Sequence, residues 1–415
     1  MRSFAGRVRT KANIHDAWRK IQENGRNSAS QETRREIAEF SDQAAQRLDR
    51  LTRKLRAGTF EFPKSKGIAA KKKSGGKRPI VLAPIEARIV QRAILNVIQD
   101  IPAIRAKIGV GHNFGGIVGA GVPEAIDQAV MAARASGYFI RTDIKSFFIN
   151  VPRDRALLKI TEITKEEEFA LLLKGATDTE LNNLASLGED SQLFPLEGTG
   201  VAQGSCLSPL LCNLLLEDFD AAMNDRGIRC IRYIDDFILF ARDRRHAFAA
   251  LKSARGFLSK LGLDAYNPLE NSEKAEHGPT SGTIAFLGCE IQKDAVRPSR
   301  AARNALLNRV KSVFDDSLGA LATPKLAVER HQTFAEALVD ASHVIRGWGN
   351  SYAFCTDQRV NDFLDEEIKK RLVDFREGFR KRIDRMKRDD RQRALGLFLL
   401  ADCRYVPLKE SFSKL

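Results

Sequence analysis

Two adjacent aspartates, Asp235 and Asp236, lie between two short apolar runs within residues 228–241, and this segment limits the fold more than any other. Each run has the length and the β-branched and aromatic content of a strand, so the segment predicts a β-hairpin with both carboxylates at its tip. Burying a carboxylate is costly unless it is paired or bound to a metal, and at a hairpin tip a divalent cation offsets the repulsion between the two. A solvated turn, where aspartate is also common, is the alternative for this segment alone.

A third aspartate ends another predicted strand. Asp143 lies at the end of an apolar run from Tyr138 to Ile144, and Phe147 and Phe148 follow it closely. Two-metal phosphoryl transfer uses carboxylates from separate strands that bridge ions about 3.5–4 Å apart. Such ions prefer oxygen ligands, and the six cysteines form no Cys-x-x-Cys pair that would favour zinc. The three aspartates therefore predict a site for two Mg²⁺ ions, with Mn²⁺ as the alternative.

Two further segments are rich in glycine. Between residues 198 and 209, glycines near Gln203 let the backbone pass close to a substrate, and Ser208-Pro209 then predicts the start of a helix. A generic loop fits this segment as well. Residues 109–121 lack the strand-to-helix frame of a dinucleotide-binding fingerprint. We expect this second stretch to permit close approach of the backbone to a partner such as a sugar-phosphate strand.

The net charge of +15 indicates a polyanionic partner, most often nucleic acid. The excess is concentrated in residues 53–78, which contain ten basic residues and a single acid. Within this region, Lys71 to Lys73 and the following Gly75-Gly76 predict a hairpin tip that leads into a strand at residues 80–82. A solvated charge run is the alternative for the three lysines.

The remaining pattern is largely helical. Two amphipathic helices are predicted within residues 15–57, the second from Ile37 to Leu55, and residues 283–291 predict a strand. Apolar residues at steps of three and four from Leu364 to Met386 predict one long helix whose other faces are basic. No apolar run approaches the roughly 18 residues of a membrane span, and the N-terminus has no apolar signal core. We therefore expect a cytoplasmic protein without membrane contact.

In this order along the chain, the motifs resemble those of bacterial reverse transcriptases, the group II intron-like and defence-associated enzymes. The successive motifs are Asp143, Gln203-Gly204 with Ser208-Pro209, Tyr233-Ile234-Asp235-Asp236 and Phe286-Leu287-Gly288. The match extends back to Gly76-Lys77-Arg78-Pro79-Ile80 and forward to residues 345–352, which are similar to a thumb signature of group II intron relatives. One departure is Ala202, which stands where the family commonly has proline.

The resemblance implies roles for the matched residues. The catalytic acids would be Asp143, Asp235 and Asp236, which would also bind the metals together with Ile144. The incoming dNTP would contact Lys77, Arg78, Phe148 and Gln203. The primer and template would contact Gly204, Tyr233, Lys274, Leu287 and Gly288. The ring of Phe148 would crowd a ribose 2′-OH, which favours dNTPs over rNTPs and hence a DNA product.

The resemblance also implies an α+β fold, a right-hand polymerase with fingers, a palm that contains an antiparallel sheet, and a helical thumb. The expected divisions are a helical N-terminal extension at 1–57, fingers at 58–135, the palm at 136–295 with inserted helices at about 153–190, the thumb at 296–355 and a basic helical C-terminal region at 356–415. The long basic helix of the last region would either pack on the thumb as a solvated helix, or dock RNA or form an oligomer.

The expected function is RNA-directed DNA synthesis, in which a primer is extended with dNTPs. The sequence shows no HNH nuclease signature and no Val-Thr-Gly triplet of retron enzymes, so it looks most like the reverse transcriptases of bacterial antiphage defence. The expected partners are an RNA template, namely a cognate non-coding RNA, together with dNTPs and a DNA product, and a homo-oligomer is a further option. A group II intron maturase that binds intron RNA is the main alternative. The three acids argue against a non-catalytic scaffold, and Phe148 argues against an RNA-dependent RNA polymerase.

Overall fold

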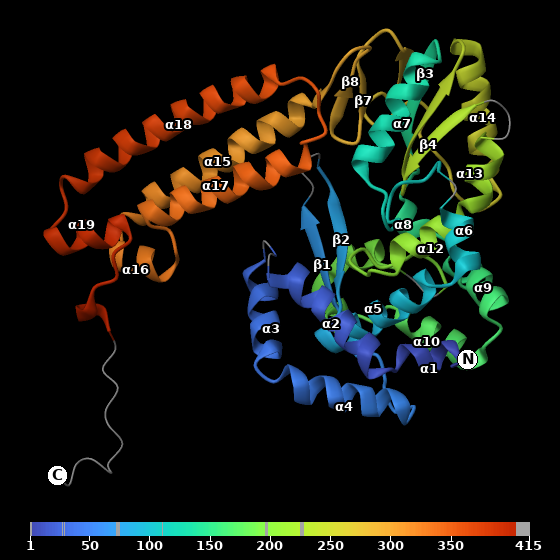
Figure 1. Ribbon diagram of the computed structural model, residues 1–415, viewed down its shortest axis with the longest axis horizontal. Coiled ribbons are helices and arrows are strands. Elements are labelled where there is room, and N and C mark those ends of the chain that lie inside the picture. Colours follow the sequence, from blue (N-terminus) through green and yellow to red (C-terminus); the bar gives the residue numbers. More distant parts are fainter. Residues whose placement is uncertain are drawn as a thin grey trace. The chain divides into compact units, whose positions relative to one another are not determined.

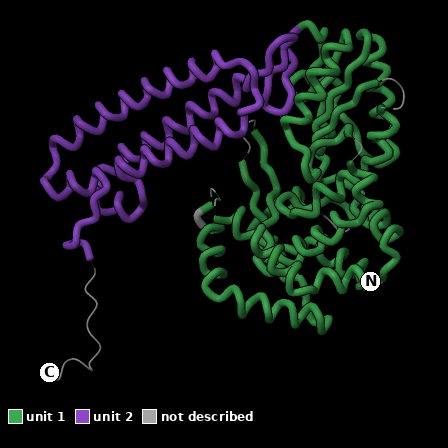
Figure 2. The backbone as a smooth tube through the Cα atoms, viewed as in Figure 1, with its two compact units in different colours: residues 1–281 green, residues 282–415 purple. Residues whose placement is uncertain are grey.

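The computed structural model describes residues 2–26, 28, 30–71, 75–109, 111–195, 198–224 and 228–403. The chain forms two compact units, Met1–Ser281 and Gly282–Leu415 (Figure 2). Both units combine helices with antiparallel sheets, which confirms the predicted α+β class. No helix in the described ranges has the length and apolar character needed to cross a membrane.

The centre of the first unit is a four-stranded antiparallel sheet in the order β4-β5-β3-β6. Its strands are β3 (Tyr138–Asp143), β4 (Arg229–Tyr233), β5 (Asp236–Ala241) and β6 (Glu276–Pro279). Helices α7 (Val122–Arg134), α13 (Glu217–Asn224) and α14 (Arg244–Ser259) pack against it (Figure 1). Every residue of β5 after Asp236 is buried, which accounts for the continuous apolar run in its sequence. The sheet thereby holds Asp143 and Asp236 at directly paired positions.

Helices and a hairpin complete the N-terminal part of this unit. The helices are α1 (Phe4–Val8), α2 (Lys11–Arg26), α3 (Gln31–Ser41), α4 (Ala44–Arg56), α5 (Ile85–Gln99) and α6 (Pro102–Ile108). Strands β1 (Lys66–Lys71) and β2 (Lys77–Leu82) pair as the predicted antiparallel hairpin. The predicted tip of this hairpin includes Lys72, Lys73 and Ser74, which lie outside the described residues.

The sequence predicts one helix from Ile37 to Leu55, but the structure has two, α3 and α4. The break falls at Asp42 and Gln43, where Gln43 leaves the helical region with φ −127° and ψ 23°. The apolar periodicity continues through the break because both helices bury their apolar residues in the same core. A pattern of buried positions therefore could not reveal this interruption.

Short helices lie between the sheet strands along the chain. They are α8 (Phe147–Asn150), α9 (Arg153–Thr164), α10 (Glu167–Thr177), α11 (Leu184–Leu187), η1 (Gly188–Leu193) and α12 (Ser208–Leu215). The segment that contains α11 and η1 contributes Leu181, Leu187, Leu193 and Phe194 to a small apolar cluster with Val81 and Ala202. This cluster joins the segment to strand β2 and to the loop before α12.

The second unit begins with a three-stranded antiparallel sheet and continues as helices. Its elements are β7 (Ile284–Phe286), β8 (Cys289–Ile291), β9 (Val296–Pro298), α15 (Arg300–Ala320), α16 (Pro324–Glu329), α17 (Phe334–Ser351), α18 (Arg359–Ile383), α19 (Arg388–Leu395) and η2 (Leu400–Asp402). Helices α15, α17 and α18 lie side by side (Figure 1). Phe375 of α18 stacks on Phe314 and Phe334 at ring-centroid distances of 4.5 and 5.1 Å.

Two sequence expectations for this unit need adjustment. The strand predicted at residues 283–291 is two strands, β7 and β8, because Leu287 and Gly288 between them both have positive φ and form a tight turn. The predicted long helix is α18, but it ends at Ile383, before Met386. The small sheet of β7 to β9 groups with the helices that follow it, and the finer division into palm and thumb remains a prediction.

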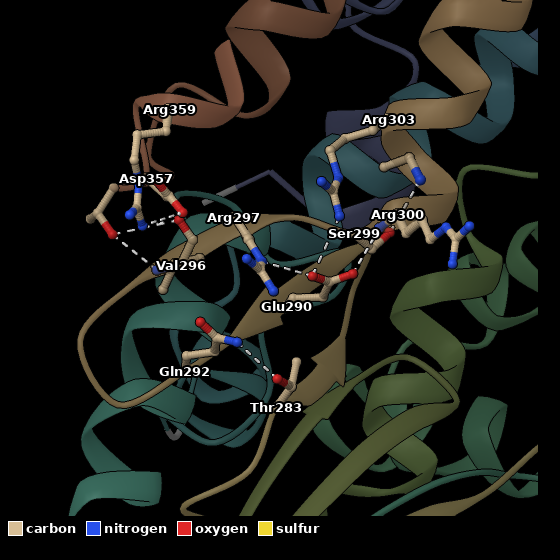
Figure 3. Close-up of polar contacts among 12 residues, drawn as sticks. Thr283, Glu290, Gln292, Val296, Arg297, Ser299, Arg300, Arg303, Asp357 and Arg359 are labelled. Atoms are coloured by element: carbon tan, nitrogen blue, oxygen red, sulfur yellow. Dashed lines mark hydrogen bonds and ion pairs between the residues drawn. The ribbon is translucent and has the colours of Figure 1, made fainter. Parts of the chain in front are cut away.

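Glu290 of β8 joins this small sheet to the first long helix (Figure 3). Its carboxylate accepts hydrogen bonds from Arg297 Nε of β9 and from the backbone N–H of Arg300, both at 2.8 Å. Arg303 on the next turn of α15 lies 3.7 Å away. Ser299 caps the same helix by accepting from Ala302 N at 3.2 Å. The N-terminal end of α15 is thus fixed to β8 and β9 by side chains.

Candidate active site

The three predicted acids converge at one end of the central sheet. Asp143 pairs with Asp236 across β3 and β5, and Tyr233 pairs with Asp236 across β4 and β5. Only Ile234 and Asp235 remain for the turn, so the hairpin predicted from the sequence is confirmed. Ile144 N donates to Asp235 O at 3.0 Å, which ties the turn to the end of β3.

The turn that carries Asp235 has an unusual backbone. Ile234 adopts φ +61°, a left-handed conformation that is strained for a β-branched residue. A Cβ on Gly115 would lie 2.7 Å from Ile234 N, so only glycine permits the loop at this position to lie against the turn. The sequence suggested that this glycine-rich stretch approaches a sugar-phosphate strand. In the structure, its close approach at Gly115 is to the protein's own hairpin.

Burial raises the pKa of all three carboxyls. The pKa of Asp143 rises to about 6, mainly because burial disfavours the charged form and secondly because Asp235 repels it. The pKa of Asp236 rises to about 7, again mainly through burial, with Arg141 opposing the rise. Burial also raises the pKa of Asp235, although hydrogen bonds and the positive charge of Arg78 act against it. Keeping these three carboxyls ionised without a nearby cation therefore costs electrostatic free energy.

Two carboxylate oxygens of this group, Asp143 Oδ1 and Asp236 Oδ1, are buried without a hydrogen-bond partner among the described residues. Such oxygens need a proton or a cation to satisfy them. Across the same residues, no three His, Cys, Asp or Glu side chains are already arranged to hold a metal ion. Mg²⁺ is a cation that fits carboxylate oxygens of this kind, because it binds through one or two carboxylates and keeps waters and substrate phosphates as its other ligands.

The raised pKa values predict how the metal-free protein responds to pH. A carboxyl with a higher pKa in the folded state stabilises the fold at low pH, and this contribution disappears as the pH rises through the folded value. For Asp143 and Asp236, whose pKa values are raised from 3.8 to about 6 and about 7, the loss begins at about pH 4 and is complete by about pH 8. We expect the melting temperature in EDTA to fall across this window and the increase caused by Mg²⁺ to be larger at the higher pH.

Thermal melts with EDTA and with Mg²⁺, each at about pH 5 and at about pH 8, test this expectation. The Asp235→Asn/Asp236→Asn variant is the reference, since it lacks two of the three titrating groups and other ionisable residues contribute equally to both proteins. A Mg²⁺ effect of the same size at both pH values in the unmodified protein would contradict the electrostatic account.

Asp143 and Asp235 line a cleft of about 680 Å³ within the first unit. Nine of the thirteen predicted site residues line it, namely Lys77, Arg78, Asp143, Ile144, Phe148, Gln203, Gly204, Asp235 and Lys274. Tyr233 and Asp236 belong to the adjoining hairpin but not to the lining of this cleft. Leu287 and Gly288 belong to the second unit, where they form the turn between β7 and β8.

The loop around Gln203 is fixed against strand β2. Val81 N donates to Gln203 O at 2.8 Å. Gly204 adopts φ +117°, and a Cβ there would lie 2.7 Å from Val81 O, so this position requires glycine. Ser208 Oγ donates to Ala202 O at 2.7 Å, which ties the loop to the start of α12 even though alanine replaces the family's usual proline.

Phe148 is half-buried at the wall of the cleft. Its ring contacts that of Phe147 edge to face, with centroids 5.9 Å apart. Its carbonyl oxygen accepts from Val201 N at 2.8 Å, so its backbone is tied to the loop that leads to Gln203. Phe148, which is predicted to exclude a ribose 2′-OH, and Gln203, which is predicted to contact the dNTP, therefore lie in two segments that are joined by a hydrogen bond.

Comparison with known proteins identifies the family of this chain. The family model described as reverse transcriptase (RNA-dependent DNA polymerase) matches residues 70–291, more than half of the chain. The chain belongs to the reverse transcriptase family. The matched range contains every predicted site residue, from Lys77 to Gly288.

Curated proteins similar to this chain include intron proteins of fungi. An uncharacterized 91 kDa protein in the cob intron of Schizosaccharomyces pombe is 27% identical over 173 residues, which cover 42% of this chain and 20% of that protein. The putative COX1/OXI3 intron 2 protein of Saccharomyces cerevisiae is 24% identical over 187 residues, 43% of this chain and 20% of that protein. The chain thus spans about a fifth of the length of these relatives. Protein YkfC of Escherichia coli is 24% identical over 280 residues, 58% of this chain and 70% of YkfC.

Solved structures similar to this chain include apo telomerase from Candida tropicalis, with a TM-score of 0.41 and 15% identity over 81% of this chain and 63% of that chain. A partial Cas6-RT-Cas1–Cas2 complex gives a TM-score of 0.36 and 19% identity over 62% of this chain and 42% of that chain.

Lys77, one of the two predicted triphosphate contacts, is paired with an acid. Its Nζ lies 2.6 and 2.8 Å from the carboxylate oxygens of Asp190 in η1. The apolar cluster formed by Phe194 and its neighbours holds the segment of η1 against strand β2, which carries Lys77. Sequence reasoning did not find Asp190, because nothing in the local pattern links it to a lysine 113 positions earlier.

We expect the Asp190→Asn substitution to lower the KM for dNTPs and to leave kcat unchanged, because Lys77 must give up Asp190 to contact a triphosphate. A partly exposed ion pair of this kind contributes about 0.2–1 kcal/mol, which corresponds to a change of roughly 1.5- to 5-fold. Steady-state primer-extension kinetics measure the effect. Glu189→Gln, at the exposed neighbouring acid, is the control. An increase in KM would show instead that Asp190 prepares Lys77 for the substrate.

Three other residues near the carboxylates were not found from the sequence. Tyr266 lines the cleft, and its backbone N–H donates to Asp143 O at 3.2 Å. Asp264 receives Lys145 Nζ at 2.6 Å, and its pKa is held well below the usual range mainly by its hydrogen bond with Arg255. No local motif marks either residue. Arg141 was detectable in principle, because it lies two positions before Asp143 and thus on the same face of β3.

Proposed function

We propose that this reverse transcriptase copies RNA into DNA by extending a primer with dNTPs. The observation that carries the proposal is the pair of unsatisfied carboxylate oxygens on Asp143 and Asp236, at facing positions of β3 and β5. Buried structural acids are normally paired, whereas acids that receive a cation during a reaction are not paired beforehand. Membership of the family and the cleft lined by predicted substrate contacts support the same activity.

In this proposal the acids orient the reacting groups. The carboxylates of Asp143, Asp235 and Asp236, with the backbone of Ile144, would hold two Mg²⁺ ions, for which Mn²⁺ is an alternative. When bound, such ions activate the primer 3′-OH and neutralise the leaving pyrophosphate. The primer 3′-oxygen attacks the α-phosphate of the dNTP, and the bond to pyrophosphate breaks. Most of the rate enhancement then comes from positioning and from electrostatic stabilisation.

The other residues of the cleft would bind and select the nucleotide. Arg78 offers a bidentate fork to the triphosphate, and Lys77 offers a point charge. Phe148 would exclude a ribose 2′-OH, and Gln203 would lie against the nascent base pair. The primer and template would follow Gly204, Tyr233, Lys274, Leu287 and Gly288, as the family resemblance implies.

We further propose that the template is a cognate non-coding RNA and that the reaction serves bacterial antiphage defence. The motif pattern of the sequence supports this setting, and so does the excess of positive charge, which suits a stably bound RNA. A group II intron maturase, which binds intron RNA, is the second candidate. It is favoured by the similarity to the cob and COX1 intron proteins.

Sequencing the nucleic acid that copurifies with the protein from its native host distinguishes the two settings. The defence proposal expects one small non-coding RNA together with complementary DNA, and it expects that DNA to vanish in the Asp235→Asn/Asp236→Asn variant. Intron RNA bound equally by both proteins, without DNA, would support the maturase and overturn the defence proposal.

A further inference from the structure

A fully buried ion pair lies next to the hairpin turn that carries Asp235. Arg232 of β4 has no exposed side-chain surface, and the side chain of Asp220 on α13 is 3% exposed. Arg232 Nε and Nη2 donate to the two carboxylate oxygens of Asp220 at 2.7 and 2.5 Å. This is the bidentate arrangement that holds a guanidinium in a single orientation.

The remaining nitrogen of the same guanidinium is directed to the turn. Arg232 Nη1 donates to the carbonyl oxygen of Ile234 at 2.9 Å and to Asn213 Oδ1 at 3.1 Å. Ile234 is the residue with the strained φ of +61°, and Asp235 follows it directly. The carbonyl of Ile234 and the N–H of Asp235 belong to one peptide plane. The hydrogen bond from Arg232 therefore fixes the orientation of the peptide that precedes the Cα atom of Asp235.

The loop around Gly115 reinforces this arrangement. Arg232 N donates to His112 O at 2.8 Å, and Phe114 N donates to Arg232 O at 3.0 Å. Asn213 Nδ2 donates to Gly115 O at 2.8 Å. The loop, α12, α13 and the hairpin therefore meet at one buried guanidinium.

Stability alone does not account for this pair. Removing two charges from water costs free energy, and replacing a buried ion pair by apolar residues of similar volume is often neutral or stabilising. The presence of such a pair is therefore weak evidence that it stabilises the fold. An apolar pair, however, has no donor for the carbonyl of Ile234. Arg232 can do what an apolar residue cannot, because it holds the peptide between Ile234 and Asp235 in one orientation while Asp220 holds Arg232 in place.

We propose that Arg232, oriented by Asp220, is a positioning residue that sets the direction of the Asp235 carboxylate for catalysis. The proposal rests on the function proposed above and adds a residue to its machinery. It does not require Arg232 to touch substrate or metal. It predicts that the protein still folds when Arg232 and Asp220 are both replaced by apolar residues, whereas the rate of the chemical step falls.

The test replaces both partners at once with the Arg232→Met/Asp220→Leu variant. Removing both charges avoids an uncompensated buried charge, so we expect a melting temperature close to that of the unmodified protein. The carboxylate of Asp235 would lose its fixed direction, and misplacement by about 1 Å can reduce a rate on the order of a hundredfold. We therefore expect kcat to fall roughly 10- to 100-fold, with the KM for dNTPs changed by less than about twofold.

A second readout does not depend on activity. Binding of Mn²⁺ to the protein, followed by electron paramagnetic resonance, should weaken several-fold in the double variant, because Asp235 no longer points at the same place. The Arg232→Lys variant keeps a buried cation beside Asp220 but lacks the second arm that reaches Ile234 O, and we expect it to fold with a smaller fall in kcat. It keeps the proposal testable if the double variant does not fold.

Glu217→Gln is the matched control. Glu217 is a buried acid on the same helix, α13, and it pairs with Lys107 and Lys159 at 2.8 and 2.9 Å rather than with the turn. We expect this variant to lose stability and keep kcat. Unchanged kcat and unchanged Mn²⁺ binding in the folded Arg232 variants would overturn the positioning role. Absence of synthesis by the unmodified protein would instead overturn the proposed function, so the two failures are distinguishable.

Discussion

The Asp235→Asn/Asp236→Asn variant is expected to make no detectable DNA while it keeps its fold. In metal-assisted phosphoryl transfer the bound ions supply several kcal/mol of transition-state stabilisation, and about 1.4 kcal/mol corresponds to a tenfold change in rate. The loss should therefore be at least roughly a thousandfold. Primer extension with a sensitive product readout measures it.

The fold should tolerate this change, because burial already disfavours the charged forms of both aspartates and asparagine carries no charge. We expect a melting temperature without metal that is equal to or above that of the unmodified protein. Asp315→Asn/Asp316→Asn is the control with the same change of charge at two adjacent, exposed aspartates of α15. Synthesis that persists in the Asp235/Asp236 variant would remove these residues from the metal site.

The second large effect is expected from Phe148→Ala, which should raise the incorporation of rNTPs relative to dNTPs. Removing the ring from the cleft wall opens space where a ribose 2′-OH would lie, while the backbone stays tied to Val201. Steric discrimination by one side chain is typically worth 1–3 kcal/mol, so the selectivity should fall by roughly 10- to 100-fold. Competition between rNTPs and dNTPs in single-nucleotide extension measures the ratio.

Phe148→Tyr is the matched control for this prediction, because it keeps an aromatic ring at the same place and should keep the preference for dNTPs. If Phe148→Ala extends primers with dNTPs at a normal rate and shows the same sugar selectivity, Phe148 is not the gate.

The sequence allowed much of the catalytic end of the sheet to be predicted. Asp143 and Asp235 each follow an apolar run of strand length, and Asp236 begins the next run, so the pattern predicts that Asp235 and Asp236 lie at a hairpin turn. The family motifs allowed residues that line the cleft to be predicted, among them Lys77, Phe148 and Gln203. These features are local or come in a fixed order along the chain, so a linear reading can find them.

The remainder of the site depends on contacts between distant segments. The pair of Lys77 with Asp190 and the support of Asp143 by Tyr266 have no local signature, because their partners are separated by more than a hundred residues. Arg232 is a charged residue in an apolar run of the sequence, but only its contacts in the folded chain show that it binds Asp220 and the carbonyl of Ile234. Periodicity likewise could not reveal the break between α3 and α4.

The most direct test of the account is primer extension by the purified protein on a synthetic RNA template of defined sequence, with a DNA primer, dNTPs and Mg²⁺, followed by sequencing of the product. The account predicts DNA complementary to the RNA, made by the unmodified protein and absent with EDTA or with the Asp235→Asn/Asp236→Asn variant. Product whose sequence is independent of the template, or equal synthesis by the variant, would contradict it.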